Sequence, residues 1–344
     1  MLARGLKELG HEIDVVALNR LGHFASELER AGVPVRCLGK RFRFDPLTWW
    51  RLRQHLREQN PEIVHSFLFA ANSYIRLPGV SPPDSLKVVS ERCVDSWKSG
   101  WQVKIDRWLK KRMHAMTANS QPVADFYSNI LKLNRDNIAV IPNGFEQSPP
   151  GDADLRTTLG LSADAQVIGF VGRLAPQKCL KDLMWAFQLI RQVNENVYLV
   201  LIGEGPDRDA LAELATTFGC RNRVFFMGHR NDAANLTAQF DVFCLPSAFE
   251  GMSNSLMEAM AAGVASVVSD IDANLQLIEH ETTGLTFPHS NGPDCARALR
   301  RLLDDNELRS RLGTAAAEKI RTDHSPATMI ERHIELYRSI NENK

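Results

Sequence analysis

The sequence predicts an α/β protein with two domains, each built around a parallel sheet. Short apolar runs alternate with longer segments of helical periodicity, the pattern of strands joined by crossover helices. At 344 residues the chain is long enough for two hydrophobic cores. Residues 148–152, Ser-Pro-Pro-Gly-Asp, resist regular structure and predict a linker between the two domains.

The front half begins with a helical pattern over residues 1–9 that Gly10 is expected to end. A βαβ domain normally opens with a strand, and none precedes this helix, so we expect a front domain that lacks its first strand. Apolar runs predict six further strands, at Ile13–Leu18, Pro34–Leu38, Ile63–Phe67, Lys87–Ser90, His114–Ala118 and Ile138–Ile141.

The back half repeats the alternation. Apolar residues of Leu180–Val193 share one face at helical spacing, which predicts a helix between two strands. The expected strands are Val167–Val171, Val197–Ile202, Arg223–Phe226, Asp241–Leu245, Val264–Val268 and Leu285–Phe287.

Charge and cysteine content narrow the function classes. The net charge is zero, but residues 1–146 carry 22 Lys and Arg against 15 Asp and Glu. This balance disfavours general nucleic-acid binding and suits contact with an anionic lipid or acceptor, although solvated basic faces explain it equally well. Six scattered cysteines without C-x-x-C spacing argue against a zinc site and favour a reducing, cytoplasmic location. No apolar run approaches the ~20 residues that span a bilayer.

Two acids bracket a Gly/Ser/Asn-rich turn that opens a helix. Glu250 and Glu258 flank the run Gly251-Met252-Ser253-Asn254, which follows the expected strand Asp241–Leu245. A helix N-terminus favours phosphate, and carboxylates accept hydrogen bonds from hydroxyls, so the segment suits a nucleotide-sugar. Two structural alternatives stay open: a capping box formed by Ser255 and Glu258, and Glu250 as an exposed loop acid.

Two cations follow the first strand of the back half. Arg173 and Lys178 lie in the loop after Gly172, at a strand end where α/β sheets bind ligands, and could neutralise a diphosphate. The alternative is that both are ordinary cations on the protein surface.

A glycine-rich turn, Gly203-Glu204-Gly205-Pro206, follows the next strand. It permits close ligand approach, or it is simply a tight turn. Neither a dinucleotide fingerprint nor a P-loop occurs.

Two features of the front half have both structural and functional explanations. His65 follows Ile63 and Val64 at the end of an expected strand, from which its side chain could face a cleft, although a lone histidine is more often structural. In Trp101–Met113, an apolar face is surrounded by five Lys and Arg residues. This pattern fits a helix that covers the sheet better than a helix lying on a membrane.

Taken together, these segments resemble the family 4 glycosyltransferases, retaining nucleotide-sugar enzymes with two facing Rossmann-like domains (the GT-B architecture). The resemblance runs from about Gly10 to Tyr337. It is carried by the ordered set Val140–Gly144, Val171–Leu174 with Lys178, Gly203–Pro206, Phe226–Gly228, Leu245–Ser247 and Glu250–Gly263.

The resemblance implies an acceptor-side domain over residues 1–147, a donor domain over 148–325, and a helix at 326–344 that packs back on the first domain. Arg173 and Lys178 would bind the donor diphosphate and Glu258 the ribose hydroxyls. Glu250 and the amides of 251–253 would contact the transferred sugar, and Gly228-His229-Arg230 would lie near the base. Such an enzyme needs neither metal nor cofactor. It would build cell-surface polysaccharide or lipopolysaccharide, on the cytoplasmic side and in peripheral contact with the membrane.

Several residues depart from the family pattern. Cys179 stands where Gly is common, Asp272, Ala273 and Gln276 replace Gly and Glu residues, and Arg92 occupies the position of a catalytic-side His. The donor site is therefore expected to be intact, and His65 and Arg92 are expected on the acceptor side, where the chain departs from the family pattern. Two alternatives stay open: an N-terminally truncated, inactive homologue that binds a nucleotide-sugar, and a sugar-nucleotide epimerase or a phosphorylase on the same fold.

Overall fold

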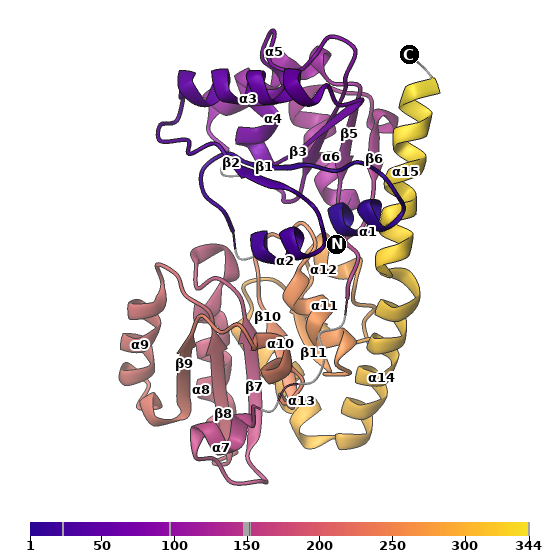
Figure 1. Ribbon diagram of the computed structural model, residues 1–344. Helices are drawn as coiled ribbons and strands as arrows, with labels where there is room; N and C mark the ends of the chain where they lie inside the picture. Colours follow the sequence, from indigo (N-terminus) through magenta and orange to yellow (C-terminus); the bar gives the residue numbers. More distant parts are fainter. Residues whose placement is uncertain (23, 96–97, 147–150, 152, 343–344) are drawn as a thin grey trace. The chain divides into compact units, whose positions relative to one another are not determined.

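The computed structural model describes residues 1–22, 24–95, 98–146, 151 and 153–342 (Figure 1). The chain forms two compact units, one of Met1–Gly144 with Pro326–Lys344 and the other of Phe145–Ser325. Each unit contains a parallel sheet, so the predicted two-domain α/β class is confirmed. Of the expected linker, Ser148, Pro149, Pro150 and Asp152 lie outside the described residues.

The second unit is built on one six-stranded parallel sheet in the order β12-β11-β10-β7-β8-β9. Its strands are β7 (Gln166–Val171), β8 (Val197–Ile202), β9 (Val224–Gly228), β10 (Val242–Leu245), β11 (Ser266–Ser269) and β12 (Leu285–Phe287). Its helices are α7 (Leu155–Leu159), η3 (Pro176–Lys178), α8 (Leu180–Arg191), α9 (Arg208–Thr217), η4 (Arg221–Arg223), α10 (Ala233–Thr237), α11 (Asn254–Ala261), α12 (Asp272–Leu275), α13 (Gly292–Asp304) and α14 (Asn306–Asp323).

The core of this unit explains its apolar strand runs. Parallel strands covered by helices on both faces bury side chains on both sides, so their sequences read as continuous rather than alternating apolar runs. All side chains of β10 are buried, and helix α8 packs its apolar stripe against α13. Gly169 lies where a Cβ would come within 1.9 Å of the Phe240 ring, so the centre of β7 requires glycine.

The first unit contains a four-stranded parallel sheet, β3-β4-β5-β6, and a separate parallel pair, β1-β2. Its strands are β1 (Val15–Ala17), β2 (Val35–Cys37), β3 (Ile63–Phe67), β4 (Leu86–Glu91), β5 (Ala115–Ala118) and β6 (Ile138–Val140). Its helices are α1 (Leu2–Glu8), α2 (Ala25–Arg30), α3 (Pro46–Gln59), α4 (Leu68–Arg76), α5 (Gly100–Leu109), η1 (Lys110–Arg112), α6 (Gln121–Leu131), η2 (Arg135–Asn137) and α15 (Pro326–Glu342). All six strands expected in this half are present. They are divided between two sheets, because β1 and β2 pair with each other and β3 is an edge strand of the four-stranded sheet.

Helix α15 ends the chain in the first unit and packs against α1. Gly5 permits this approach, because a Cβ there would lie 2.1 Å from Cδ1 of Ile330. Helix α1 ends at Glu8, and Gly10, with φ of +87°, closes it as expected.

A buried ionic network ties the end of β4 to three helices. Lys98 Nζ donates to Asp106 at 2.9 Å and to the Tyr127 hydroxyl at 3.0 Å, and it lies 3.4 Å from Glu91. Arg76 donates to the other Asp106 oxygen at 2.6 Å. Burial is the main cause that raises the pKa of Glu91, with Lys98 opposing it. Charged side chains are buried here because each has an oppositely charged or hydroxyl partner.

Several expected boundaries were wrong by one or two residues, for local reasons. The strand expected at Val264 begins at Ser266, since the Val264 amide still donates to the Ala259 carbonyl at the end of α11. Arg223 belongs to η4 rather than to β9, and α8 ends at Arg191 because the Val193 amide closes a turn on Ile190. Such terminal turns are not visible in apolar periodicity.

Candidate functional site

The site in the second unit lies where the sheet reverses its strand order. From β7 the chain continues to β8 and β9 on one side, whereas β10, on the other side of β7, continues to β11 and β12. The loops that follow β7 and β10 therefore lead to opposite halves of the sheet, and open α/β sheets bind their ligands beside such a point. Lys178 lies in the first of these loops, and Glu250 lies in the second.

Lys178 and Glu250 form an ion pair across the two loops. Nζ of Lys178 lies 2.5 Å from Oε1 of Glu250, which also accepts a 2.6 Å hydrogen bond from the Ser247 hydroxyl. Glu250 is buried, at 7% exposure, so the alternative of an exposed loop acid is wrong. The structure thus brings together two of the three residues expected to be catalytic.

Two hydrogen bonds to main-chain carbonyls fix the two loops to each other. The Gln177 side-chain amide donates to the Phe249 carbonyl at 2.7 Å, and the Ala248 amide donates to the Gln177 carbonyl at 2.9 Å. Ser247 is held in turn, because the Ser269 hydroxyl donates to its carbonyl at 2.6 Å. The ion pair is therefore carried by a rigid frame, as a binding site requires.

Three glycines bring the ends of β7, β8 and β9 into close backbone contact. Gly203 has φ of +134°, and a Cβ there would lie 1.9 Å from the Gly172 carbonyl oxygen. Gly228 has φ of +66° and accepts a hydrogen bond from the Gly203 amide at 2.8 Å. A Cβ at Gly205 would also clash, 2.1 Å from the Leu174 carbonyl. The glycines of these three loops are needed to close the backbone around this edge.

Arg173 lies in the same loop as Lys178 and is exposed. It forms no ion pair with another residue in the described part of the chain, whereas the next residue, Leu174, is fully buried and anchors the loop. An exposed guanidinium beside an anchored loop remains available to an anion.

Cys179 adopts a left-handed conformation, with φ of +48°, immediately before α8. This is the position at which the family favours glycine, and the backbone geometry gives the reason, because side chains with a Cβ are strained there.

Helix α11 begins at Asn254 with Ser253 as its N-cap, whose hydroxyl accepts from the Leu256 amide at 3.4 Å. The alternative capping box of Ser255 and Glu258 is wrong, because Glu258 lies in the second turn, beyond reach of the first amide. Gly251, Met252 and Ser253 are buried ahead of the helix, where its dipole is positive. Glu258 is partly buried, and burial raises the pKa of its carboxyl.

His229 and Arg230 follow β9. His229 is exposed, while Arg230 forms two hydrogen bonds with Asp232, of 2.8 and 2.6 Å. These bonds raise the pKa of Arg230 and lower that of Asp232. Arg230 would have to leave this pair to bind a base through its guanidinium.

His65 and Arg92 lie in the first unit, and both contact the ring of Phe67. His65 stacks on Phe67 with a centroid distance of 4.5 Å, and the Arg92 guanidinium carbon lies 5.4 Å from the same ring. The two ring nitrogens of His65 bond the Tyr337 hydroxyl, at 2.6 Å, and the Ser90 hydroxyl, at 2.7 Å. Burial, assisted by His333 and Arg92, lowers the pKa of His65 to about 3, so this histidine is neutral.

Sequence reasoning gave no role to Ser247, Gln177, His333 or Tyr337. Ser247 was detectable, since it lies two residues after the end of β10 and three residues before Glu250. His333 donates from Nδ1 to the Met329 carbonyl at 2.7 Å, and its buried Nε2 has no hydrogen-bond partner among the described residues. Its position beside His65, with ring centroids 5.7 Å apart, depends on how α15 packs, which no local pattern gives.

Comparisons with known proteins identify the family of the chain. The profile of the family described as "Glycosyltransferase Family 4" matches residues 1–148, and that of "Glycosyl transferases group 1" matches residues 152–319. The chain belongs to the family 4 glycosyltransferases. The ion pair and the glycine loops of the second unit lie in the group 1 match, and His65 and Arg92 lie in the family 4 match.

Curated relatives share modest sequence identity with the chain. The lipopolysaccharide core biosynthesis glycosyltransferase LpsD of Rhizobium meliloti is 32% identical over 58% of the chain, and the aligned part spans 57% of LpsD. MJ1607 of Methanocaldococcus jannaschii, described as an uncharacterized glycosyltransferase, is 26% identical over 98% of the chain and 92% of its own length.

A crystal structure of HepE from Anabaena, in complex with UDP and glucose, matches the fold with a TM-score of 0.86. It is 22% identical, and the match covers 98% of this chain and 95% of HepE. This likeness confirms a GT-B-type fold. Within the described residues, no helix has the length and apolar character to cross a bilayer.

Proposed function

We propose that the protein is a retaining glycosyltransferase that moves a sugar from a nucleotide-diphosphate sugar to a hydroxyl of a glycan or glycolipid. The observation that carries the proposal is the Lys178–Glu250 pair at the strand-order reversal, fixed by Ser247 and Gln177. At this point the ammonium group of Lys178 can meet the departing phosphate, and the carboxylate of Glu250 can meet sugar hydroxyls. The two groups bond directly to each other.

Each part of the donor has a matching group in this proposal. Lys178 and Arg173 bind the diphosphate, assisted by the positive end of α11. Glu250 and the amides of Gly251, Met252 and Ser253 bind the transferred sugar. Ribose hydroxyls bond to Glu258, and the base lies against Gly228 and His229, with Arg230 beside it.

The transfer takes place on one face of the sugar. The bond from the anomeric carbon to the phosphate oxygen breaks, the acceptor hydroxyl oxygen bonds to that carbon, and its proton passes to the departing phosphate oxygen. Lys178 stabilises the charge that builds on the leaving group, which is worth several kcal/mol in comparable sites. The anomeric configuration is retained because entry and departure share a face.

The relatives support the biological setting. LpsD is described as acting in lipopolysaccharide core biosynthesis, and HepE is described in complex with UDP and glucose. We therefore assign the chain to cell-surface polysaccharide or lipopolysaccharide-type biosynthesis. A cytoplasmic location, on the inner face of the membrane, is consistent with six cysteines that are present as thiols.

The test combines binding with turnover. Titration calorimetry of the full chain against a panel of nucleotide-sugars should show heat of association for at least one donor, and product anomers should match the donor configuration by NMR. Lys178→Ala should lower turnover by at least about 10²-fold. Its matched control is Lys181→Ala, three residues further on and exposed on α8, which should leave turnover unchanged. No binding to any donor, or full activity of Lys178→Ala, would overturn the proposal.

A further inference from the structure

The first unit carries a cluster of exposed apolar side chains around the start of α3. Phe42, Phe44, Leu47 and Trp50 are 68%, 62%, 50% and 54% exposed, within nine residues of chain. Single exposed apolar residues are ordinary on protein surfaces, but a contiguous group of large ones marks a contact surface.

The same segment is strongly basic. From residue 36 to residue 57 the chain carries seven cations, Arg36, Lys40, Arg41, Arg43, Arg51, Arg53 and Arg57, and Asp45 is the one acid. Asp45 is buried and does not offset this charge at the surface. The surface therefore combines exposed aromatic rings with excess positive charge.

The loop before α3 is held in place with its phenylalanines outward. Asp45 caps the helix, accepting from the amides of Leu47 at 3.1 Å and Thr48 at 3.3 Å. Its second oxygen accepts from the Arg41 amide at 3.0 Å, and the Tyr74 hydroxyl accepts from the Asp45 amide at 2.9 Å. Phe42 and Phe44 are exposed on a constrained turn, which lowers the entropy cost of inserting them into a partner.

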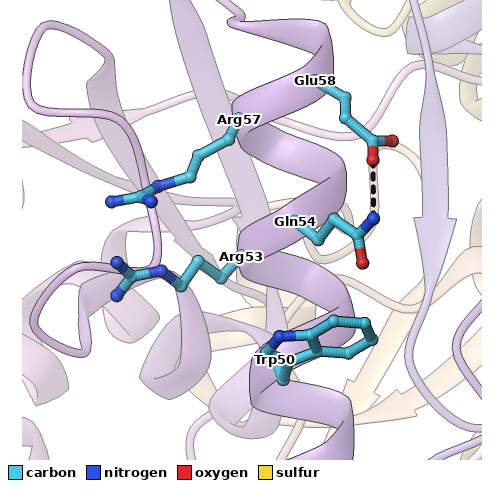
Figure 2. Close-up of a pocket in the computed structure, with 5 residues that line it drawn as sticks. All are labelled: Trp50, Arg53, Gln54, Arg57 and Glu58. Carbon is cyan, nitrogen blue, oxygen red and sulfur yellow. Dashed lines mark hydrogen bonds between the residues drawn. The ribbon is translucent and has the colours of Figure 1, made fainter.

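Helix α3 itself is divided between a buried and an exposed face. Thr48, Leu52, His55 and Leu56 are buried, and the exposed face has Leu47 and Trp50 near the helix start. Figure 2 shows Arg53 and Arg57, one turn apart, extending to the same side of the helix, and the Trp50 ring at the lower end, below Gln54. On the other side Gln54 donates to Glu58 at 2.8 Å, so this acid is already engaged.

The start of α5 continues the surface. The Arg43 guanidinium carbon lies 5.0 Å from the centre of the Trp101 ring, which joins the loop to the first turn of α5. Trp108 is seven residues further on, hence on the same side of that helix, and is 59% exposed with Arg112 over its ring. Figure 1 places α3 and α5 at the same end of this unit.

We propose that this aromatic–basic surface (Phe42, Phe44, Leu47, Trp50, Arg53, Arg57 and Trp108) binds the surface of an anionic lipid bilayer. Arginines pair with lipid phosphates, tryptophans occupy the headgroup level, and phenylalanines reach the acyl boundary. Nucleic acid would use the arginines but offers no apolar layer for Phe42 and Phe44. Apart from Trp108, the surface lies outside the segment Trp101–Met113. That segment as a whole does not lie on the membrane, because Leu109 is fully buried and Lys110 donates to the Leu131 and Lys132 carbonyls.

The test is co-sedimentation of the full chain with vesicles of phosphatidylcholine alone or mixed with phosphatidylglycerol. We expect binding to the anionic vesicles, weakened by added salt. Phe42→Ser with Phe44→Ser should reduce the partition coefficient by more than about tenfold. Arg53→Gln with Arg57→Gln should reduce it by about fivefold for each arginine.

Matched controls lie on the second unit. Arg297→Gln with Arg321→Gln removes the same charge from exposed helix positions, and Val193→Ser removes an apolar side chain that is 64% exposed. Both should bind as the unaltered chain does, and circular dichroism should show every variant folded. No donor is needed, so this result is independent of the proposed glycosyl transfer.

Three results would overturn the proposal. The unaltered chain could stay in solution with anionic vesicles, or it could bind neutral and anionic vesicles equally. The phenylalanine variant could also bind as well as the unaltered chain, which would indicate a general polyanion site.

Discussion

The ion pair between Lys178 and Glu250 permits a test that separates structure from catalysis. Lys178→Met removes the cation and keeps the aliphatic stem. Among the residues that the structure describes, this leaves the buried Glu250 carboxylate bonded to the Ser247 hydroxyl alone. Breaking a buried pair from one side costs ~3–5 kcal/mol. Because the Lys178 and Glu250 side chains retain 13% and 9% exposure, we expect the lower end, about 3 kcal/mol.

Glu250→Gln should cost less, about 1 kcal/mol, since the amide still bonds with Ser247 and Lys178 can turn toward solvent. In the double variant no buried charge is left without a partner. The double-mutant cycle should therefore give a coupling energy of about 2 kcal/mol. Catalysis should behave differently. Lys178→Met should lower kcat by about 10²–10³-fold, and the double variant should not regain it, because the leaving group still lacks its cation.

Stability is measured by pulsed hydrogen–deuterium exchange in a urea series, read on peptides from β7 and β10, so that only the second unit reports. Activity is measured as initial rates with the donor that calorimetry selects. A coupling energy near zero would refute the ion pair as a stabilising contact. Recovery of kcat in the double variant would refute the role of Lys178 at the leaving group.

Three further predictions follow from the backbone and from buried groups. Gly203→Ala should destabilise the second unit by about 3 kcal/mol, since its Cβ would lie 1.9 Å from the Gly172 oxygen. The control Gly160→Ala has a positive φ but open space around the Cβ, and it should cost about 1 kcal/mol. Both free energies are measured by urea unfolding. Cys179→Gly should be more stable than Cys179→Ala by roughly 1 kcal/mol, because only the alanine retains a Cβ at φ of +48°; equal stabilities would contradict this. His65 has a folded-state pKa of about 3, below its ordinary 6.5, so the unfolded chain binds more protons between these values and stability should fall as pH decreases from 6.5 toward 3. His65→Gln should remove up to about 1.4 kcal/mol per pH unit from that slope in pH-dependent unfolding, and an unchanged slope would show that His65 is protonated in the fold.

The α/β class and the strand content could be predicted because they depend on local order. Buried parallel strands give apolar runs such as Val197–Ile202, and crossover helices give the 3.6-residue period of α8. Lys178, Glu250 and the glycines could be proposed as site residues for the same reason, since they lie at strand ends or in the loops that follow them. The end of α8 and the start of β11 were misplaced, because a single hydrogen bond decides each boundary.

The sequence by itself determined which residue types stand at the ends of β7 and β10, but not that Lys178 and Glu250 meet. Only the order of strands in the folded sheet decided that pairing, since it brings together loops 72 residues apart. The same holds for His65, whose partner Tyr337 is 272 residues away on α15. Such side-chain pairs depend on the packing of segments that are far apart in the sequence. The local periodicity of the chain does not predict that packing.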